Sequence, residues 1–280
     1  MRCSDGNYYV VKFQDNPQGT RILVNEILGT RLAGRLALPI AIHHVVVVSE
    51  ELIHYSEEMV FELARGSMPC TSGRCFGSCL PVDPRQVPLT DLLPDSLFSG
   101  LTNISDFCGM LVFDKWTCNT DGRQVVFSRK KGNAAYSAVM IDQGMCFNGP
   151  EWNFPDAPLR SLYRIYPVYE RVCGMDDFEP WLTRLETEIS ADVLCDLASD
   201  IPPEWYASDS ASIQTLLERL NRRRGKVREL LSLAHQSCPR VFPNWVEKRT
   251  RGEKHHVSSN NSQIPPASSS DHVDACERHN

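Results

Sequence analysis

The sequence lacks the features that would assign it to a membrane, secreted or nucleic-acid-binding class. No apolar run approaches the roughly 20 residues that span a bilayer. The first six residues, Met1 to Gly6, are polar and include no apolar signal region. The formal net charge is -6 at pH 7, so a broad basic surface is not expected. We therefore predict a cytoplasmic globular protein with neither a membrane nor a direct nucleic-acid partner.

The sequence also lacks the cysteine pairs that usually bind zinc. It has 11 cysteines, an odd number, and no CxxC pair. Cys70, Cys75 and Cys79 form a cluster, whereas a structural zinc site normally takes four ligands. Small thiols in a loop are the favoured interpretation. A metal site held by these cysteines remains an alternative.

The first part of the chain alternates predicted strands with one helix. Residues 7–13 are predicted as a strand, and residues 21–36 as a helix with leucine and valine at i+4 spacing. Residues 40–48 are apolar and β-branched and predict another strand, and residues 59–63 predict one more. We expect residues 1–65 to form a small, β-rich first lobe.

The second part is predicted to be larger and mainly helical. Residues 66–94 are rich in Gly, Pro, Ser and Cys and are predicted as a connection into a second lobe that ends near residue 245. Residues 104–113 predict a buried helix. Residues 123–128 and 136–142 predict a hairpin around the charged turn Lys130 to Asn133. Residues 246–280 are polar and predicted to be disordered. The predicted fold is α+β with two lobes.

A loop with aspartate and asparagine is predicted between the buried helix and the hairpin. Asp114 and Asn119 have the Asp-x4-Asn spacing of kinase catalytic loops. In such loops the aspartate orients the acceptor hydroxyl and the asparagine amide binds Mg²⁺. This spacing alone is weak evidence, because it occurs by chance in many sequences.

A second carboxylate follows the hairpin. Asp142 stands at the end of an apolar strand in the tripeptide Asp142-Gln143-Gly144. Carboxylate oxygens suit Mg²⁺, and glycine permits the sharp turn that follows. An aspartate that merely caps a strand end is the alternative.

The first strand and the first helix supply a lysine and a glutamate. Lys12 lies in the strand and is predicted to neutralise phosphates, while Val10 shares its face and is predicted to contact adenine. Glu26 shares a helical face with small and apolar residues, so it is predicted to point inward and to pair with Lys12. An exposed strand lysine and a solvated helix carboxylate are the alternatives.

These residues occur in the order that kinases use, which strengthens each motif. Phosphoryl transfer requires positioned phosphates, a metal ion and an oriented acceptor. The set therefore predicts ATP and Mg²⁺ as cofactors. We take Lys12, Glu26 and Asp114 as catalytic, Val10 and Lys12 as nucleotide-binding, and Asn119 and Asp142 as metal-binding.

The sequence resembles the HipA-like kinase domain family of bacterial proteins. The resemblance lies in residues 5–13, 16–19, 23–32, 106–124, 141–156 and 201–206. It implies a two-lobed protein-kinase-like fold and ATP-dependent phosphotransfer. By position it makes Lys12 the phosphate lysine, Glu26 its partner, Asp114 the catalytic aspartate, and Asn119 and Asp142 the metal ligands. It leaves Asp121 a supporting role beside the metal.

One departure from the family keeps two functions open. The Gly-rich phosphate loop is missing or reduced to Ser4-Asp5-Gly6. The chain is either an active kinase that modifies a Ser or Thr hydroxyl of a protein, or a nucleotide-binding pseudokinase or interaction module without turnover. Neither the protein substrate nor the oligomeric state is indicated.

Two further segments are given structural interpretations. The basic run of residues 219–228 is predicted as a solvated helix face rather than an RNA-binding or other anion-binding surface. The block Trp152 to Asp156 follows the Asp-x-Gly turn, where kinases keep their activation segment, and its aromatic residues are predicted to pack rather than to contact substrate.

Overall fold

The computed structural model describes residues 1–64, 66–129 and 135–246. The chain divides into two units, Met1–Glu247 and Lys248–Asn280, and the described residues all belong to the first. The predicted turn Lys130 to Asn133 and nearly all of the predicted tail lie outside the described residues.

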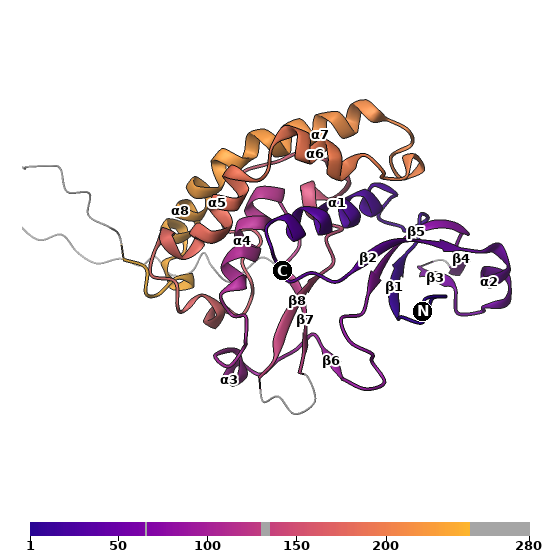
Figure 1. The fold of residues 1–280 in the computed structure, drawn as a ribbon, viewed down its shortest axis with the longest axis horizontal. Helices are drawn as coiled ribbons and strands as arrows, with labels where there is room; N and C mark the ends of the chain where they lie inside the picture. Colours follow the sequence, from indigo (N-terminus) through magenta and orange to yellow (C-terminus); the bar gives the residue numbers. More distant parts are fainter. Residues whose placement is uncertain (65, 130–134, 247–280) are drawn as a thin grey trace, which may run out of the picture. The chain divides into compact units, whose positions relative to one another are not determined.

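A small antiparallel sheet carries the predicted lysine strand. Its strand order is β1 (Tyr9–Lys12), β5 (Gly73–Cys79) and β2 (His43–Val48). Helix α1 (Arg21–Arg35) follows β1, as predicted. Beside this sheet lie α2 (Glu50–Tyr55) and a hairpin of β3 (Val60–Leu63) with β4 (Gly66–Pro69), as Figure 1 shows.

The structure corrects the prediction for residues 66–94. Instead of an irregular connection, this stretch contains β4 and the central strand β5, which pairs with both β1 and β2. A lobe boundary after residue 65 would therefore separate β5 from β1 and β2, the strands with which it pairs. Glycine disfavours strands, but Gly77 is required here, because a Cβ would lie 2.4 Å from Val46. The composition of residues 66–94, rich in Gly, Pro, Ser and Cys, gave no indication of this strand.

The second half is mainly helical, as predicted. It contains α3 (Asp95–Phe98), α4 (Asp106–Thr117), α5 (Glu179–Thr187), α6 (Ala191–Ala198), α7 (Ser210–Arg223) and α8 (Val227–Ser237). A second antiparallel sheet has the order β6 (Leu89–Thr90), β7 (Gln124–Ser128) and β8 (Ser137–Ile141), which confirms the predicted hairpin strands. Helix α1 lies between the first sheet and the large helices (Figure 1) and contacts β5, α4 and α6. None of the helices in the described ranges is long and apolar enough to cross a membrane.

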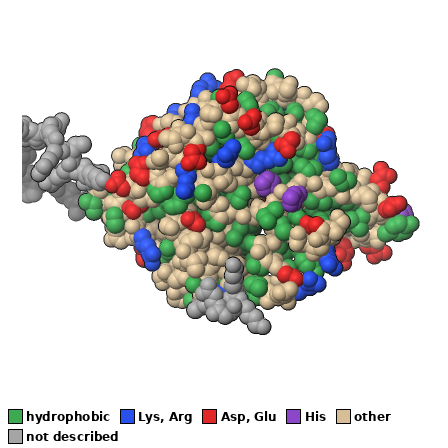
Figure 2. Space-filling view, viewed as in Figure 1, with side chains coloured by type: hydrophobic (Ala, Val, Ile, Leu, Met, Phe, Trp, Pro, Cys, Tyr) green, Lys and Arg blue, Asp and Glu red, His purple; other side chains and the backbone are tan. Residues whose placement is uncertain are grey.

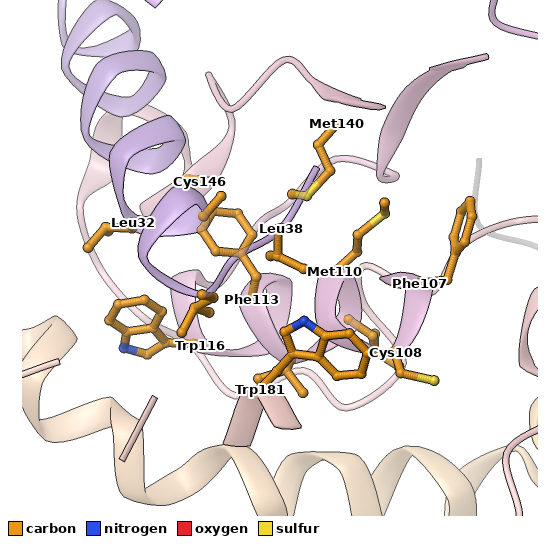
Figure 3. Close-up of a cluster of buried hydrophobic side chains, with 14 of the residues drawn as sticks. Leu32, Leu38, Phe107, Cys108, Met110, Phe113, Trp116, Met140, Cys146 and Trp181 are labelled. Carbon is orange, nitrogen blue, oxygen red and sulfur yellow. The ribbon is translucent and has the colours of Figure 1, made fainter. Parts of the chain in front are cut away.

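Helix α4 forms the centre of the larger hydrophobic core. Figure 3 shows Met110, Phe113 and Trp116 of α4 among the side chains of this core. The indole of Trp181 packs onto α4 at Gly109, where a Cβ would lie 2.3 Å from the ring. The helix continues to Thr117 and ends at Cys118, whose φ of 53° is left-handed. The predicted end at residue 113 is therefore four residues short, and Asp114 lies in a helix, not in a loop.

Candidate active site

Three charged side chains from three elements meet at one point. The Nζ atom of Lys12 in β1 lies 2.5 Å from Oε1 of Glu26 in α1 and 2.8 Å from Oδ1 of Asp142, which follows β8. The predicted pair of strand lysine and helix glutamate is thus present. The Glu26 side chain is 2% exposed, whereas those of Lys12 and Asp142 are 22% and 30% exposed. Lys12 and Asp142 are therefore accessible to a ligand, whereas the buried Glu26 holds the Lys12 ammonium in place.

Burial and charge set the protonation of this cluster. Burial raises the pKa of Glu26 to about 7, although Lys12 acts in the opposite direction. Burial alone would lower the pKa of Lys12, but the two carboxylates outweigh it and hold the pKa above its usual value. Burial would raise the pKa of Asp142, but Lys12 outweighs it and keeps the pKa low. Lys12 and Asp142 therefore stay charged near neutral pH.

Tight contacts fix the Asp142-Gln143-Gly144 turn against α1. The backbone N–H of Gln143 donates to Oε2 of Glu26 at 2.9 Å. Asp142 has a φ of 56°, which aspartate tolerates better than most residues. A Cβ on Gly144 would lie 2.9 Å from Ile22, and a Cβ on Gly29 would lie 2.8 Å from Gln143. Both glycines thus permit the close approach that brings Asp142 to Lys12.

The structure contradicts the placement of Asp114 in the catalytic loop. Its side chain is 0% exposed and forms an ion pair with Arg123, whose side chain is 1% exposed. The Nε atom of Arg123 donates to Oδ2 of Asp114 at 3.0 Å, and a second guanidinium nitrogen donates to Oδ1. A carboxylate enclosed in this way is not placed to orient an acceptor hydroxyl.

Asn119 is also engaged within the protein. Its Nδ2 donates to Oδ1 of Asp114 at 3.0 Å, and its Oδ1 accepts from the backbone N–H of Asp121 at 3.2 Å. The residue is 2% exposed. The Asp-x4-Asn spacing therefore joins the last turn of α4 to the loop after it, and the asparagine amide does not face a metal.

The exposed carboxylate of this loop is that of Asp121. Asp121 is exposed and lies between α4 and β7. The loop lies beside the turn that carries Asp142, because the N–H and hydroxyl of Thr120 both donate to the carbonyl of Met145, at 3.1 and 3.3 Å. Gln124, which follows this loop, pairs with Ile141 directly before Asp142. These contacts bring the Asp121 loop and the Asp142 turn together.

Val10 lies where its predicted role requires an open surface. It is 53% exposed on β1, and its cross-strand partner is Ser78, whereas Lys12 pairs with Phe76. Alternation along the strand puts Val10 and Lys12 on the same face of the sheet. The adenine contact itself stays a prediction.

Asn25 is a buried residue that the sequence reasoning missed. Its Nδ2 lies within 3.0 Å of the carbonyl oxygens of Gly144, Cys146 and Gly149, and its Oδ1 accepts from Nε1 of Trp152 at 2.8 Å. Asn25 therefore holds the segment after Asp142 against α1. The available signal was a polar residue next to Glu26, with apolar residues on both sides of the pair in residues 22–28. The position is 0% exposed.

The basic run of residues 219–228 is only in part the solvated helix face that we predicted, because Arg222 and Lys226 are exposed but other arginines of the run are not. Arg223 is 6% exposed, and it donates to the carbonyls of Lys115 and Phe154 and to the carboxylate of Asp156. Arg219 donates to the carbonyl of Trp152. These arginines hold the Trp152 to Asp156 block in place. The structure also shows Trp152 packed into the core, 3% exposed.

Lys115 fixes the chain just beyond that block. Its ammonium lies 2.6 Å from the carbonyl of Pro158 and also bonds to the carbonyl of Arg160. Burial lowers the pKa of Lys115 to about 7.

On the face that Figure 2 shows, basic side chains are interspersed with acidic ones. That no nucleic acid binds directly stays a prediction.

The alternative of a cysteine metal site does not fit the geometry. Cys75 and Cys79 lie four residues apart on one strand, which separates them by about 13 Å at roughly 3.3 Å per residue. One zinc ion holds thiolates at about 2.3 Å. Among the residues that the structure describes, no three potential Cys, His, Asp or Glu ligands cluster.

Comparison with known proteins agrees with this architecture. A sequence model of HipA-like kinases matches residues 1–148, which include Lys12, Glu26, Asp121 and Asp142. A search of curated proteins gives no match. Among solved structures, a proinflammatory kinase of Helicobacter pylori, CtkA, superposes with a TM-score of 0.50 at 15% identity, over 84% of this chain and 90% of CtkA.

Two further structures are similar. Hydra Fam20 with sugar has a TM-score of 0.49 at 14% identity, over 82% of this chain and 79% of Fam20. The Golgi casein kinase with Mn/ADP bound has a TM-score of 0.47 at 11% identity, over 85% of this chain and 70% of the kinase. The CtkA likeness shows the fold alone, and it confirms the two-lobed, α+β, protein-kinase-like architecture.

Proposed function

The chain belongs to the HipA-like kinase family, and on this premise we propose that it transfers the terminal phosphoryl group of ATP to a Ser or Thr hydroxyl of a protein. The observation that carries the proposal is the meeting of Lys12, Glu26 and Asp142. Its members come from a strand, a helix and a turn that are far apart in the sequence. A lysine shared by two carboxylates, and still partly exposed, is suited to receive an anionic ligand.

Each member of this cluster has a distinct role in the proposal. Lys12 neutralises the nucleotide phosphates, and Glu26 holds the ammonium in place. Val10, exposed on the same face, contacts the adenine ring. Asn25 and Gly29 keep the Asp142 turn against α1, so that Lys12 and Asp142 approach the phosphates from fixed directions.

A divalent cation fits the residues around Asp142. Both the Lys12 and the Gly144 bonds to Asp142 end on Oδ1, and the side chain is 30% exposed. Carboxylate oxygen is the donor that Mg²⁺ prefers. Asn119, the other predicted ligand, does not fit because its amide is bonded within the protein. Bound Mg²⁺ would neutralise charge on the phosphate oxygens.

We assign the acceptor side to Asp121 in place of Asp114. Asp121 is exposed, and its loop is fixed to the Asp142 turn through Thr120. An exposed carboxylate beside the phosphate site can accept the proton of an attacking hydroxyl and hold that hydroxyl in line with the phosphorus. Asp114 supports this loop from within, through Asn119.

A second candidate is nucleotide binding without transfer. The kinase pattern places an asparagine five residues after the catalytic aspartate. Counted from Asp121, that position is Val126 in strand β7, which has no metal-binding atom. One of the two usual metal ligands is thus lacking on this assignment, which favours weak turnover.

Transfer of labelled phosphate separates the two candidates. The full chain is incubated with γ-labelled ATP and Mg²⁺, alone and with dephosphorylated casein as a serine-rich acceptor. We expect Lys12→Met, Asp142→Asn and Asp121→Asn each to lower transfer at least about a hundredfold. Asp121→Asn should keep the thermal stabilisation by Mg-ATP, whereas Asp142→Asn should lose it. Asp83, which forms a surface ion pair with Arg85, supplies the control Asp83→Asn, which should leave both unchanged.

The wild-type result decides between the candidates. Stabilisation by Mg-ATP without transfer supports the second candidate. The absence of both rejects nucleotide binding altogether. Transfer that survives in Asp121→Asn rejects the assignment of the acceptor side.

A further inference from the structure

Arg123 lies at the centre of a buried polar network outside the Lys12 cluster. Its guanidinium donates to both carboxylate oxygens of Asp114, to the carbonyl of Ile141 at 3.2 Å, and to Oε1 of Gln143 at 2.9 Å. Four of the five N–H groups that a guanidinium carries are thus bonded within the protein at once. A buried ion pair is often no more stabilising than apolar residues of the same size. The directions of the hydrogen bonds that Arg123 makes are therefore more informative than the contribution of the ion pair to stability.

On one side, the network leads to the acceptor loop. Asp114, paired with Arg123, accepts from Nδ2 of Asn119, and Oδ1 of Asn119 accepts from the backbone of Asp121. The Asp121 backbone thus depends on a buried carboxylate that Arg123 orients. These bonds bridge the end of α4 and the loop that follows it.

On the other side, the network holds both neighbours of Asp142. The Ile141 carbonyl precedes Asp142 and the Gln143 side chain follows it, and both accept from the same nitrogen of Arg123. The backbone of Gln143 in turn donates to Glu26, the partner of Lys12. An unbroken chain of hydrogen bonds therefore runs from Lys12 to the backbone of Asp121.

We propose that Arg123 is a positioning residue, which fixes the acceptor loop of Asp121 and the metal turn of Asp142 in one relative arrangement. The proposal rests on the phosphotransfer function argued above. The Arg123 side chain is 1% exposed, so it acts through the residues that it bonds. It acts because a planar fork sets the directions of several bonds together, which a lysine ammonium at the same place would not. Misplacement of reacting groups by about 1 Å can lower a rate a hundredfold.

Two substitutions separate positioning from stability. Gln143→Met removes the side-chain bond from Arg123 to the residue after Asp142. It leaves intact the bond to the Ile141 carbonyl, the Asp114 pair and the backbone bond to Glu26. Arg123→Lys keeps the charge beside Asp114 but loses the fork. We expect each variant to bind Mg-ATP with an affinity within about threefold of wild type and to transfer phosphate at least about tenfold more slowly. Arg228→Met, which removes ion pairs to Glu179 and Glu186 away from this network, is the matched control and should leave transfer unchanged.

Hydrogen exchange gives a readout that does not require transfer. In Gln143→Met we expect faster amide exchange both in residues 142–146 and across the network in residues 119–123. Exchange that rises only in residues 142–146 would overturn the coupling, even if transfer falls. Transfer that stays at the wild-type rate in both variants would overturn the positioning role. If wild type itself transfers no phosphate, the proposed function fails, and the exchange result still decides whether Arg123 couples the two loops.

Discussion

Two charged clusters lie on the same hydrogen-bond network but differ in exposure. In the Lys12 cluster, the lysine and Asp142 side chains are 22% and 30% exposed. In the Arg123 cluster, the side chains of Arg123 and Asp114 are 1% and 0% exposed. Both pair a cation with carboxylates at hydrogen-bond distance. Exposure, rather than charge or order along the chain, separates the cluster that a ligand can reach from the one that supports it.

The clusters also differ in how a ligand or a mutation would affect them. Lys12 is a point charge on a flexible stem and can exchange a carboxylate for a phosphate. The guanidinium of Arg123 is fixed by bonds to Asp114, Gln143 and the backbone. We therefore expect changes at the first cluster to alter ligand binding, and changes at the second to alter stability and geometry.

The largest predicted effect is the loss of the buried carboxylate. Asp114→Asn leaves Arg123 buried without its counter-charge, because an amide is neutral. Breaking a buried pair from one side costs about 3–5 kcal/mol in the free energy of unfolding. Urea denaturation of the variant and the wild type measures this difference. Asp83→Asn, at the more exposed pair with Arg85, is the control and should unfold like wild type.

The opposite pattern would reverse the assignment of the two clusters. If Asp114→Asn unfolded like the Asp83→Asn control and yet transferred no phosphate, Asp114 would be a catalytic group after all. The buried pair would then have no structural role.

Much of the fold follows from local patterns in the sequence. The residues of α1 and the strands of the β7–β8 hairpin have clear periodicity, and the structure has them within a few residues of the prediction. The central strand β5 was missed because Gly77 and the cysteines resemble a loop. Its glycine is explained by close contacts with the neighbouring strands, of which the contact with Val46 is the nearest. A tertiary contact of this kind leaves no local pattern.

The site was predictable where one element determines the direction of a side chain. The helical face of Glu26 pointed it inward, and the structure places it against Lys12. The prediction that Asp114 and Asn119 face a ligand rested on their spacing, and spacing carries no information about burial. Arg123, the partner of Asp114, is a basic residue directly before β7, and nothing local shows that its guanidinium turns inward. Asp121 is exposed in the loop after α4, a helix that continues beyond its predicted end.

An intermediate effect is predicted from the protonation of Glu26. Its pKa is about 7 in the folded protein, against 4.5 as the ordinary value. Between these two pH values the folded state binds more protons than the unfolded state, so stability should fall as the pH rises from 4.5 to 7. One such group contributes a slope of at most about 1.4 kcal/mol per pH unit. Denaturation of Glu26→Gln across this range should show a flatter pH profile than wild type.

A control on an exposed carboxylate isolates this contribution. Glu50→Gln, in the exposed helix α2, removes a carboxylate that is not part of either cluster. It should keep the wild-type slope. An equal slope in Glu26→Gln and wild type would show that Lys12 keeps Glu26 ionised throughout the range, and that burial does not set its protonation.

The smallest predicted change in stability comes from Gly29→Ala. This substitution is the most specific test of the exposed cluster, because it moves the Asp142 turn without changing a charged residue. In Gly29→Ala the new Cβ would lie 2.8 Å from Cβ of Gln143, so the Asp142 turn must shift away from α1. We expect a cost of about 1 kcal/mol and a fall in phosphate transfer of at least about tenfold. Gly34→Ala on the same helix meets only the tip of Ile40, at 3.1 Å, and should keep transfer intact. If the two variants transferred phosphate equally well, the close approach of α1 to the Asp142 turn would not set the geometry of the site.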